Sequence, residues 1–411
     1  MNYELWNTRA CRVGCLSRCR TAARVLVAIG FVSTVNVSTA SAQQTVTDVL
    51  SFLMTNRAIA TDDFDRDASA ATQTRDTIAN FLVLELASLP VSTSSGGFAY
   101  RLDPALGINV RSSDSFGTFF VERSLTSGRN QASFGLGYRS ARYDSIDGRN
   151  LRDGTLVSTA SILRGEPQPF DVETVSLEMR TDTVTLTGNL GVTDRFDVGA
   201  AIPITRVSLV GQRLDTYRGT AFTQATATAE ASGLGDIVLR AKYNVVRSGA
   251  SGLAFGGEAR LPTGDEENLL GTGEASFAPR VIASYDGGYV GVHGEVGYSF
   301  GGIADTLSYG AALTAAPSAR FTIVGEVLGR RIDGLGRLIS STQAHPRLIG
   351  VQTIRLTAVE ETVDSIVAVV GFKWNLGSAF LVTANVLQPL TDVGLKANWV
   401  PTITFDYAFG G

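Results

Sequence analysis

The stretch Asp236-Ile237-Val238-Leu239-Arg240-Ala241-Lys242-Tyr243 carries its three charged residues on one parity. Successive side chains of a β-strand point to opposite faces, so Asp236, Arg240 and Lys242 share one face and the odd-numbered apolar residues share the other. The same division recurs in the segments that follow. The sequence therefore predicts a series of strands, each with one polar and one apolar face.

The last segment of the chain repeats this pattern with aromatic residues. Its odd positions from Trp399 to Phe409 are aromatic, aliphatic or proline, while Thr402, Thr404 and Asp406 occupy even positions. An alternating, aromatic-rich strand at the C-terminus of an exported chain is typical of outer-membrane barrels. We therefore expect an all-β fold, a transmembrane antiparallel β-barrel in the bacterial outer membrane. Its C-terminal strand would contact the barrel-assembly machinery.

Composition agrees with a membrane protein that crosses with strands. Charged residues make up only 18% of the 411, and mean hydropathy is +0.13. Beyond residue 42, no apolar run reaches the roughly 18 residues that mark a transmembrane helix. Mild apolarity without such a run fits a chain in which every second residue faces lipid.

Residues 1–42 have the features of a signal peptide. A basic region with five Arg precedes an apolar run from Val25 to Val37, and Ala40-Ser41-Ala42 forms a cleavage site that would leave Gln43 as the mature N-terminus. The alternative is a membrane anchor, but the apolar run is short for a span. All three cysteines lie in this segment, so the mature chain has neither disulfides nor thiolate sites. Cleavage changes the net charge from −4 to −8, which argues against a nucleic-acid partner.

Residues 43–97 are expected to form a short N-terminal helical segment and linker, since Ala68 to Leu89 has apolar residues at helical spacing. This segment either extends into the periplasm or fills the barrel as a plug. Residues 98–411 are expected to form the barrel. Tight connections alternate there with long ones at roughly 145–171, 215–233, 262–275, 333–363 and 390–398, as in barrels with short periplasmic turns and long external loops.

The number of strands is even in single-chain bacterial barrels. Thirteen segments alternate: 116–125, 130–146, 172–192, 196–214, 234–247, 253–262, 276–286, 289–300, 306–315, 320–333, 363–376, 379–389 and 399–409. Either 116–125 lies outside the wall and the barrel has 12 strands, or 98–112 adds a strand and it has 14. The sequence leaves both open.

Charged residues of one parity are expected to face the lumen, because an Arg or Lys at the lipid midplane costs about 2–4 kcal/mol. Either they line a polar passage, or they form an ion-pair network that fills a narrow lumen. The lumen-facing candidates are Arg139, Asp236, Arg240, Lys242, Glu258, Arg260, Arg280, His293, Glu295, Glu326 and Lys373.

Three motifs resemble a known family. They are Gly233-Leu234-Gly235-Asp236, Leu261-Pro262-Thr263-Gly264-Asp265 and Gly271-Thr272-Gly273. In this order they resemble the MetA-pathway of phenol degradation family of outer-membrane transporters, over about residues 180–411. The resemblance implies a barrel that passes aromatic or other hydrophobic compounds, and it brings no catalytic residues.

Nothing in the sequence indicates an enzyme, a metal site or a cofactor. The Gly-Leu-Gly-Asp stretch lacks the lysine and following helix of a phosphate-binding loop. His293 shares a face with Glu295, but metal binding or acid–base chemistry needs further partners. We therefore read His293 as a member of the lumen network.

The function expected from the sequence is passive passage of small, hydrophobic or aromatic molecules across the outer membrane. The expected partners are membrane lipid, lipopolysaccharide and the transported solute. One alternative is a barrel with a filled lumen that serves a structural or surface-interaction role. A barrel-embedded hydrolase is the third reading, and it has least support.

Overall fold

A computed structural model describes residues 44–55, 63–88, 97, 99–103, 108–111, 113–249, 251–377 and 379–409. The predicted signal peptide, residues 1–42, lies outside the described residues. The described residues belong to one compact unit that begins at Gln44.

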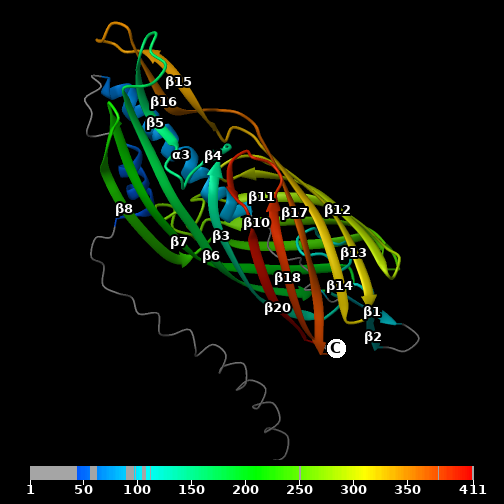
Figure 1. The fold of residues 1–411 in the computed structure, drawn as a ribbon. Helices are drawn as coiled ribbons and strands as arrows, with labels where there is room; N and C mark the ends of the chain where they lie inside the picture. Colours follow the sequence, from blue (N-terminus) through cyan, green and yellow to red (C-terminus); the bar gives the residue numbers. More distant parts are fainter. Residues whose placement is uncertain are drawn as a thin grey trace, which may run out of the picture. The chain divides into compact units, whose positions relative to one another are not determined.

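Twelve antiparallel strands close into a barrel, which confirms the lower of the two expected numbers (Figure 1). Closure is made by the last wall strand against the first, with Phe409 opposite Ala132. The wall strands are β3 (Ala132–Ile146), β6 (Asp171–Gly191), β7 (Phe196–Tyr217), β9 (Ile237–Ser248), β10 (Ser251–Leu261), β11 (Ser276–Asp286), β12 (Val290–Gly301), β13 (Thr306–Ser318), β14 (Phe321–Ile332), β17 (Val363–Gly377), β18 (Phe380–Pro389) and β20 (Val400–Phe409).

Two segments considered as wall strands, 116–125 and 98–112, are not part of the wall. Residues 116–125 form no strand at all, although they alternate in sequence. Residues 98–112 contain β1 (Tyr100–Asp103) and β2 (Ile108–Arg111), which pair with each other and with no wall strand. The wall therefore begins at Ala132.

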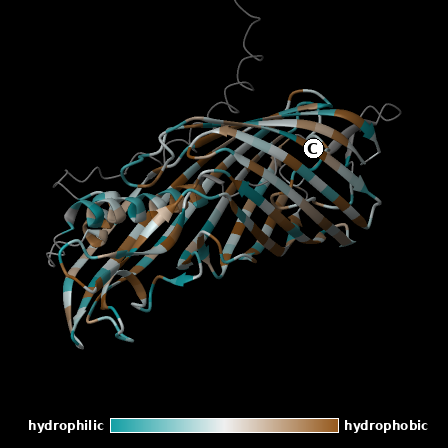
Figure 2. Ribbon diagram, turned by 90° about the horizontal axis from the view of Figure 1, so that it is seen from above, coloured by the Kyte–Doolittle hydropathy of each residue, from teal (hydrophilic) through white to brown (hydrophobic). Residues whose placement is uncertain are grey.

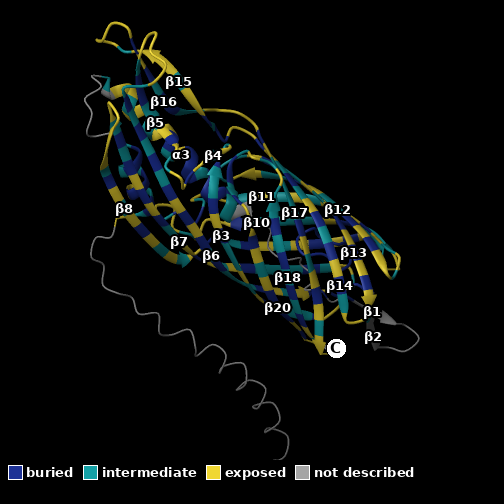
Figure 3. Cartoon of the chain, in the orientation of Figure 1, coloured by how far each residue is buried: buried dark blue, intermediate teal, exposed yellow. Residues whose placement is uncertain are grey.

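Each wall strand alternates between an apolar outer face and a more polar inner face (Figures 2 and 3). On β11, Ile282 and Ser284 are buried while Val281 and Tyr285 are exposed. A closed barrel leaves no unpaired strand edge, and an exposed apolar surface of this extent is satisfied by lipid. The chain is therefore an outer-membrane barrel.

The sheet continues past the barrel at the end where the long connections lie (Figure 1). Strands here belong to segments that the sequence marks as loops: β4 (Arg149–Asn150), β5 (Leu156–Leu163), β8 (Thr220–Leu234), β15 (Arg337–Ala344), β16 (Val351–Val359) and β19 (Leu395–Ala397). They pair as β5–β6, β5–β16, β15–β16 and β7–β8. The β8 segment alternates Thr with Ala, so it lacks the polar–apolar contrast by which wall strands are recognised. We call this part, with the outer halves of β6 and β7, the extension.

Two helices pack against the extension. The first is α2 (Val46–Met54), which begins with a capping box between Thr45 and Asp48. The second is α3 (Phe64–Ser88), which contains the predicted helical segment. A side chain at Gly211 of β7 would collide with Leu53, so the glycine allows α2 to lie close to the sheet. Neither described helix is long and apolar enough to cross a membrane.

Candidate functional site: an occluded lumen

The interior of the barrel is occupied by residues 113–128, which we call the inner segment. Every residue from Ser115 to Gly128 is buried, and the chain then enters the wall at β3. Its backbone is hydrogen-bonded to side chains from six wall strands: β7, β9, β11, β12, β14 and β17. A segment held from six strands closes the lumen at this level.

Glu326 is the acceptor that holds the middle of the inner segment. Its buried carboxylate on β14 accepts hydrogen bonds from the backbone N–H groups of Phe119, Phe120 and Val121. Bonds to an ionised acceptor are about twice as strong as neutral ones. The sequence predicts a lumen-facing Glu326, and the structure shows which group it binds.

Cationic and amide side chains hold the carbonyl groups of the same segment. Lys242 Nζ donates to the carbonyl of Arg123 at 3.0 Å, and Asn244 Nδ2 donates to that of Ser124 at 2.6 Å. On the other side of the barrel, Lys373 Nζ donates to the carbonyl of Phe116 at 3.4 Å. These contacts satisfy carbonyl groups that would otherwise be buried without partners.

Three further wall side chains accept from the backbone of the inner segment. Asp197 accepts from the N–H of Ser127 at 2.7 Å, and Ser284 accepts from that of Ser124 at 2.8 Å. Glu295 accepts from the N–H of Glu122 at 3.2 Å. Several residues predicted to line a passage are thus engaged by protein backbone.

A charge cluster lies beside this segment, on β9 to β12. Glu258 pairs with Arg240 at 3.3 Å, Arg280 at 3.2 Å and Arg260 at 3.4 Å. Arg240 also pairs with Glu122, which pairs with Lys242, and Arg280 also pairs with Glu295. The cluster so connected holds four cations and three carboxylates, and it joins the inner segment to the wall.

His293 lies deep in the barrel and takes part in neutral hydrogen bonds. Its Nδ1 lies 3.0 Å from Ser284 Oγ and its Nε2 lies 3.5 Å from Thr314 Oγ1. Ser284 Oγ also accepts the N–H of Ser124, so His293 supports the inner segment through that hydroxyl. In the part of the chain that the structure describes, no group of three or more His, Cys, Asp or Glu side chains is arranged to hold a metal ion.

Asp236 organises a loop at the rim of the barrel. Its carboxylate accepts from the N–H of Gly264 at 3.1 Å, and from the N–H and hydroxyl of Thr272 at 2.9 and 2.8 Å. A side chain at Gly264 would meet the backbone of Gly271. The three family motifs therefore meet at one place, where they pin the 262–275 loop to the start of β9.

Arg139 is the remaining candidate. It lies on β3, half-buried, opposite Thr402 of β20 and Thr183 of β6. No ion pair to Arg139 is found among the residues that the structure describes, although Glu85 and Arg260 lie close enough to act on its charge.

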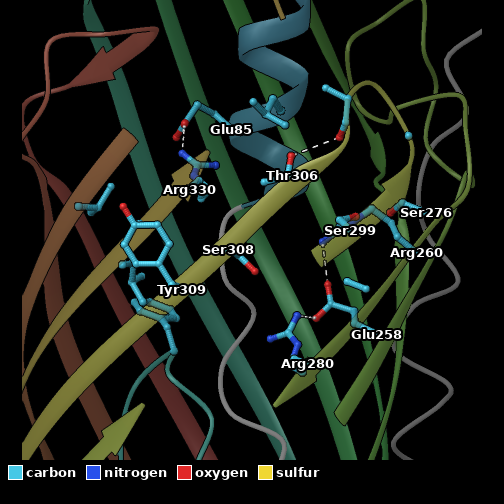
Figure 4. Close-up of a pocket in the computed structure, with 18 of the residues that line it drawn as sticks. Glu85, Glu258, Arg260, Ser276, Arg280, Ser299, Thr306, Ser308, Tyr309 and Arg330 are labelled. Atoms are coloured by element: carbon cyan, nitrogen blue, oxygen red, sulfur yellow. Dashed lines mark hydrogen bonds and ion pairs between the residues drawn. The ribbon is translucent and has the colours of Figure 1, made fainter. Parts of the chain in front are cut away.

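A cavity of about 190 Å³ lies between α3, the inner segment and the wall (Figure 4). One side is formed by the arginines of the charge cluster and Glu258. The facing side carries the aliphatic side chains of Leu328, Val367, Leu387 and Val400 from β14, β17, β18 and β20, with Tyr309 and Arg330 beside them. Glu85 of α3 pairs with Arg330 at 2.6 Å at the cavity edge, across from Glu258 and Arg280 in Figure 4.

Glu122 and Arg123 are the important interior residues that the sequence analysis missed. Arg123 is among the largest fully buried side chains, and Glu122 belongs to the charge cluster. Adjacent charges fall on both parities, so a wall strand through 116–125 would place one of them in lipid at a cost of about 2–4 kcal/mol for Arg. This parity break is the signal that could have identified the inner segment.

The part of the extension against which α2 packs contains buried acidic side chains. Arg213 of β7 donates to the carbonyls of Leu53 and Thr55 at the end of α2. Glu173 stands directly opposite Asp215 on the neighbouring strand, and both are buried. Burial, followed by the effect of nearby Asp215, raises the pKa of Glu173 to about 7, although Arg213 opposes the shift.

The family model described as the MetA-pathway of phenol degradation matches residues 150–326. The predicted resemblance is thereby confirmed over residues 180–326, which contain all three motifs; the match also begins earlier than predicted and does not extend to residues 327–411. No curated protein matches the chain.

Several solved outer-membrane barrels are similar in structure at low identity. A crystal structure of an outer membrane channel from Pseudomonas putida F1 has 14% identity and a TM-score of 0.43, covering 68% of this chain and 96% of that one. A FadL homologue from Pseudomonas aeruginosa has 10% identity and a TM-score of 0.32, covering 78% and 98%. The monoaromatic hydrocarbon channel CymD has 10% identity and a TM-score of 0.25, covering 69% and 90%. The barrel itself rests on the strand pairings above.

Proposed function

We propose that the chain is an outer-membrane channel for the passive passage of small hydrophobic or aromatic molecules. The observation that carries this proposal is the cavity with aliphatic side chains on one wall, which lies inside the barrel and is bordered by Phe120 and Glu122 of the inner segment. The matching family concerns phenol degradation, which agrees with an aromatic solute. A lumen closed by hydrogen-bonded chain does not favour free flow of ions or sugars.

Passage in this proposal requires the inner segment to move. It is held by hydrogen bonds to side chains, so its displacement exchanges these bonds for bonds to water or solute. Among the lumen candidates, Lys242, Glu295, Glu326 and Lys373 then hold this segment in place. Membrane lipid and lipopolysaccharide surround the barrel, and the barrel-assembly machinery binds the C-terminal strand.

The filled lumen also favours the second reading, a barrel with a structural or surface-interaction role. The two are separated by measuring entry of 1-naphthol through membranes with a lipopolysaccharide outer leaflet, with and without the refolded chain from Gln43. We expect faster naphthol entry together with low ionic conductance. Unchanged naphthol entry would contradict the channel and favour the structural role, and a large steady conductance would contradict the occluded state.

The proposal includes the absence of enzymatic activity. The Ser284–His293 pair is the nearest approach to a hydrolytic dyad, but Ser284 Oγ accepts a backbone N–H and is buried beneath the inner segment. Assay of ester hydrolysis by the refolded chain and by His293→Ala tests this point: activity that depends on His293 would favour the hydrolase.

A further inference from the structure

The cavity beside the charge cluster has two chemically different walls. Arg240, Arg260 and Arg280 lie on one side, and the aliphatic side chains of β14 to β20 lie on the other. A wholly apolar molecule would leave the guanidinium groups facing an apolar surface, and a wholly polar one would leave the aliphatic wall without contacts. The geometry suits a molecule with one polar end and one apolar body.

The polar wall presents guanidinium donors to the cavity, and the buried Nε of Arg280 has no hydrogen-bond partner among the described residues. Each guanidinium has five N–H groups and no acceptor, whereas a carboxylate offers roughly four lone-pair sites. Glu258 already accepts from all three arginines. Glu295 is engaged by Arg280 and by the N–H of Glu122. A ligand at this wall must therefore bring acceptors.

The shape of the guanidinium group favours a carboxylate as this acceptor. The cluster contains Arg240, Lys242, Arg260 and Arg280 beside three carboxylates, and the carboxylate of Asp236 also acts on Arg260. Guanidinium groups match a carboxylate in plane and spacing, which an alcohol does not.

We propose that this cavity binds small aromatic or alicyclic monocarboxylates, with the carboxylate at Arg260 and Arg280 and the ring against Leu328, Val367 and Leu387. The proposal rests on the proposed function, in that the cavity is taken as a station on the solute's path. It extends that function by naming the polar group of the ligand, a carboxylate, and the residues that select it. Glu258 then acts as an internal occupant that competes for the arginines.

Binding of benzoate and of benzyl alcohol to the refolded chain tests the head group, because the two probes share the ring and differ in charge. We expect benzoate to bind at least tenfold more tightly. Arg260→Gln should remove most of this preference without changing the affinity for benzyl alcohol. Arg206→Gln, which removes an exposed arginine of the extension paired with Glu230, is the matched control and should change neither.

Glu258→Gln gives the most discriminating result. It removes the competing carboxylate, so benzoate affinity should rise several-fold and benzoate should raise the thermal stability of the variant more than benzyl alcohol does. A purely structural role for Glu258 predicts the opposite. If this variant does not assemble, Arg260→Lys is used: the loss of the planar fork should weaken benzoate several-fold, and an unchanged affinity would overturn the proposal.

Equal affinity for the two probes in the unchanged chain would also overturn it. That result would leave the proposed channel intact, because 1-naphthol entry is measured separately. Conversely, acid-selective binding without any accelerated entry would preserve the ligand site and contradict the channel.

Discussion

The barrel wall and the inner segment both alternate apolar and polar residues in sequence, yet the wall forms strands while the inner segment is irregular, and they lie in different environments. A wall strand has lipid on one side and protein on the other, so its charges keep to one parity, as at Asp236, Arg240 and Lys242. The inner segment has protein on every side, and all its residues from Ser115 to Gly128 are buried. Alternation of apolar residues therefore indicates a strand with two different environments only when the charged residues also keep to one parity.

Lys242→Met is the change that most strongly separates the inner segment from the wall. Lys242 pairs with Glu122 at 3.2 Å, and both side chains are almost fully buried. Loss of one partner of a buried pair costs about 3–5 kcal/mol, because the other charge remains uncompensated. Urea unfolding should show a loss of this size. The double variant with Glu122→Gln should recover part of it, and additive losses would show that the pair does not couple the two regions.

Val281→Arg tests the outer face of the wall. Val281 lies in the middle of β11 and is exposed on the apolar face, so the substitution should lower the free energy of folding into bilayers by about 2–4 kcal/mol. Val210→Arg is the matched control. The last residue of β7 that pairs with β9 is Ala201, so the exposed Val210 lies in the extension. Its cost should be about 0–1 kcal/mol. Equal costs would contradict the boundary between barrel and extension.

Glu326→Ala tests the hold on the inner segment itself. The three N–H groups of Phe119, Phe120 and Val121 lose their acceptor, and a single buried group left unsatisfied costs about 1–3 kcal/mol. We expect lower thermal stability and more frequent conducting events in planar bilayers. Glu326→Gln keeps one carbonyl acceptor and should show a smaller change in both. Unaltered conductance in both variants would mean that other contacts suffice to keep the lumen closed.

The stability of the packing between α2 and the extension should depend on pH. The pKa of Asp171 is raised to about 7 by burial and by its hydrogen bond with Asp215, and that of Glu173 is raised to about 7 as well. Both lie where β6 has passed its last pairing with β3, outside the membrane span. The folded state therefore binds more protons than the unfolded one, and its stabilisation, complete below about pH 4, is lost as pH rises through 7.

Hydrogen exchange of α2 measures this effect. After correction for intrinsic rates, amides of Val49 to Leu53 should exchange a few-fold faster at pH 8 than at pH 5. Asp67 of α3 and Arg213 of β7 also act on Glu173, so the response belongs to the group of charges around it. Glu173→Gln should flatten the pH dependence, and amides of β11 in the barrel provide the internal control. A flat profile in the unchanged chain would contradict the prediction.

The wall was largely predictable because lipid imposes a simple rule on every strand. All twelve wall strands fall within a few residues of the segments marked by alternation, including the final strand that pairs with β3. The extension was not predictable in the same way. One face of β8 packs into the hydrophobic core through Ala225 and Ala229, but the opposite face carries Thr226 and Thr228, so the contrast between the two faces in the sequence is weak.

The candidate site was predictable in its residue types but not in its partners. Parity selects Lys242, Glu326 and Lys373 as facing inward, since each would be costly in lipid. It does not say what they meet there. The choice between a polar passage and a filled lumen depends on whether a distant segment enters the barrel.

Local sequence patterns are enough to identify the alternation, the compartment and the segments of all twelve wall strands, because a bilayer acts on every second residue of each strand. The folded structure was needed to choose 12 strands over 14, and to show that residues 113–128 fill the lumen, that three motifs meet around Asp236 and that Glu258 is shared by three arginines. These contacts join residues far apart in the chain. The contacts form because the closed barrel brings these residues close together, and no local sequence pattern indicates which distant residues will meet.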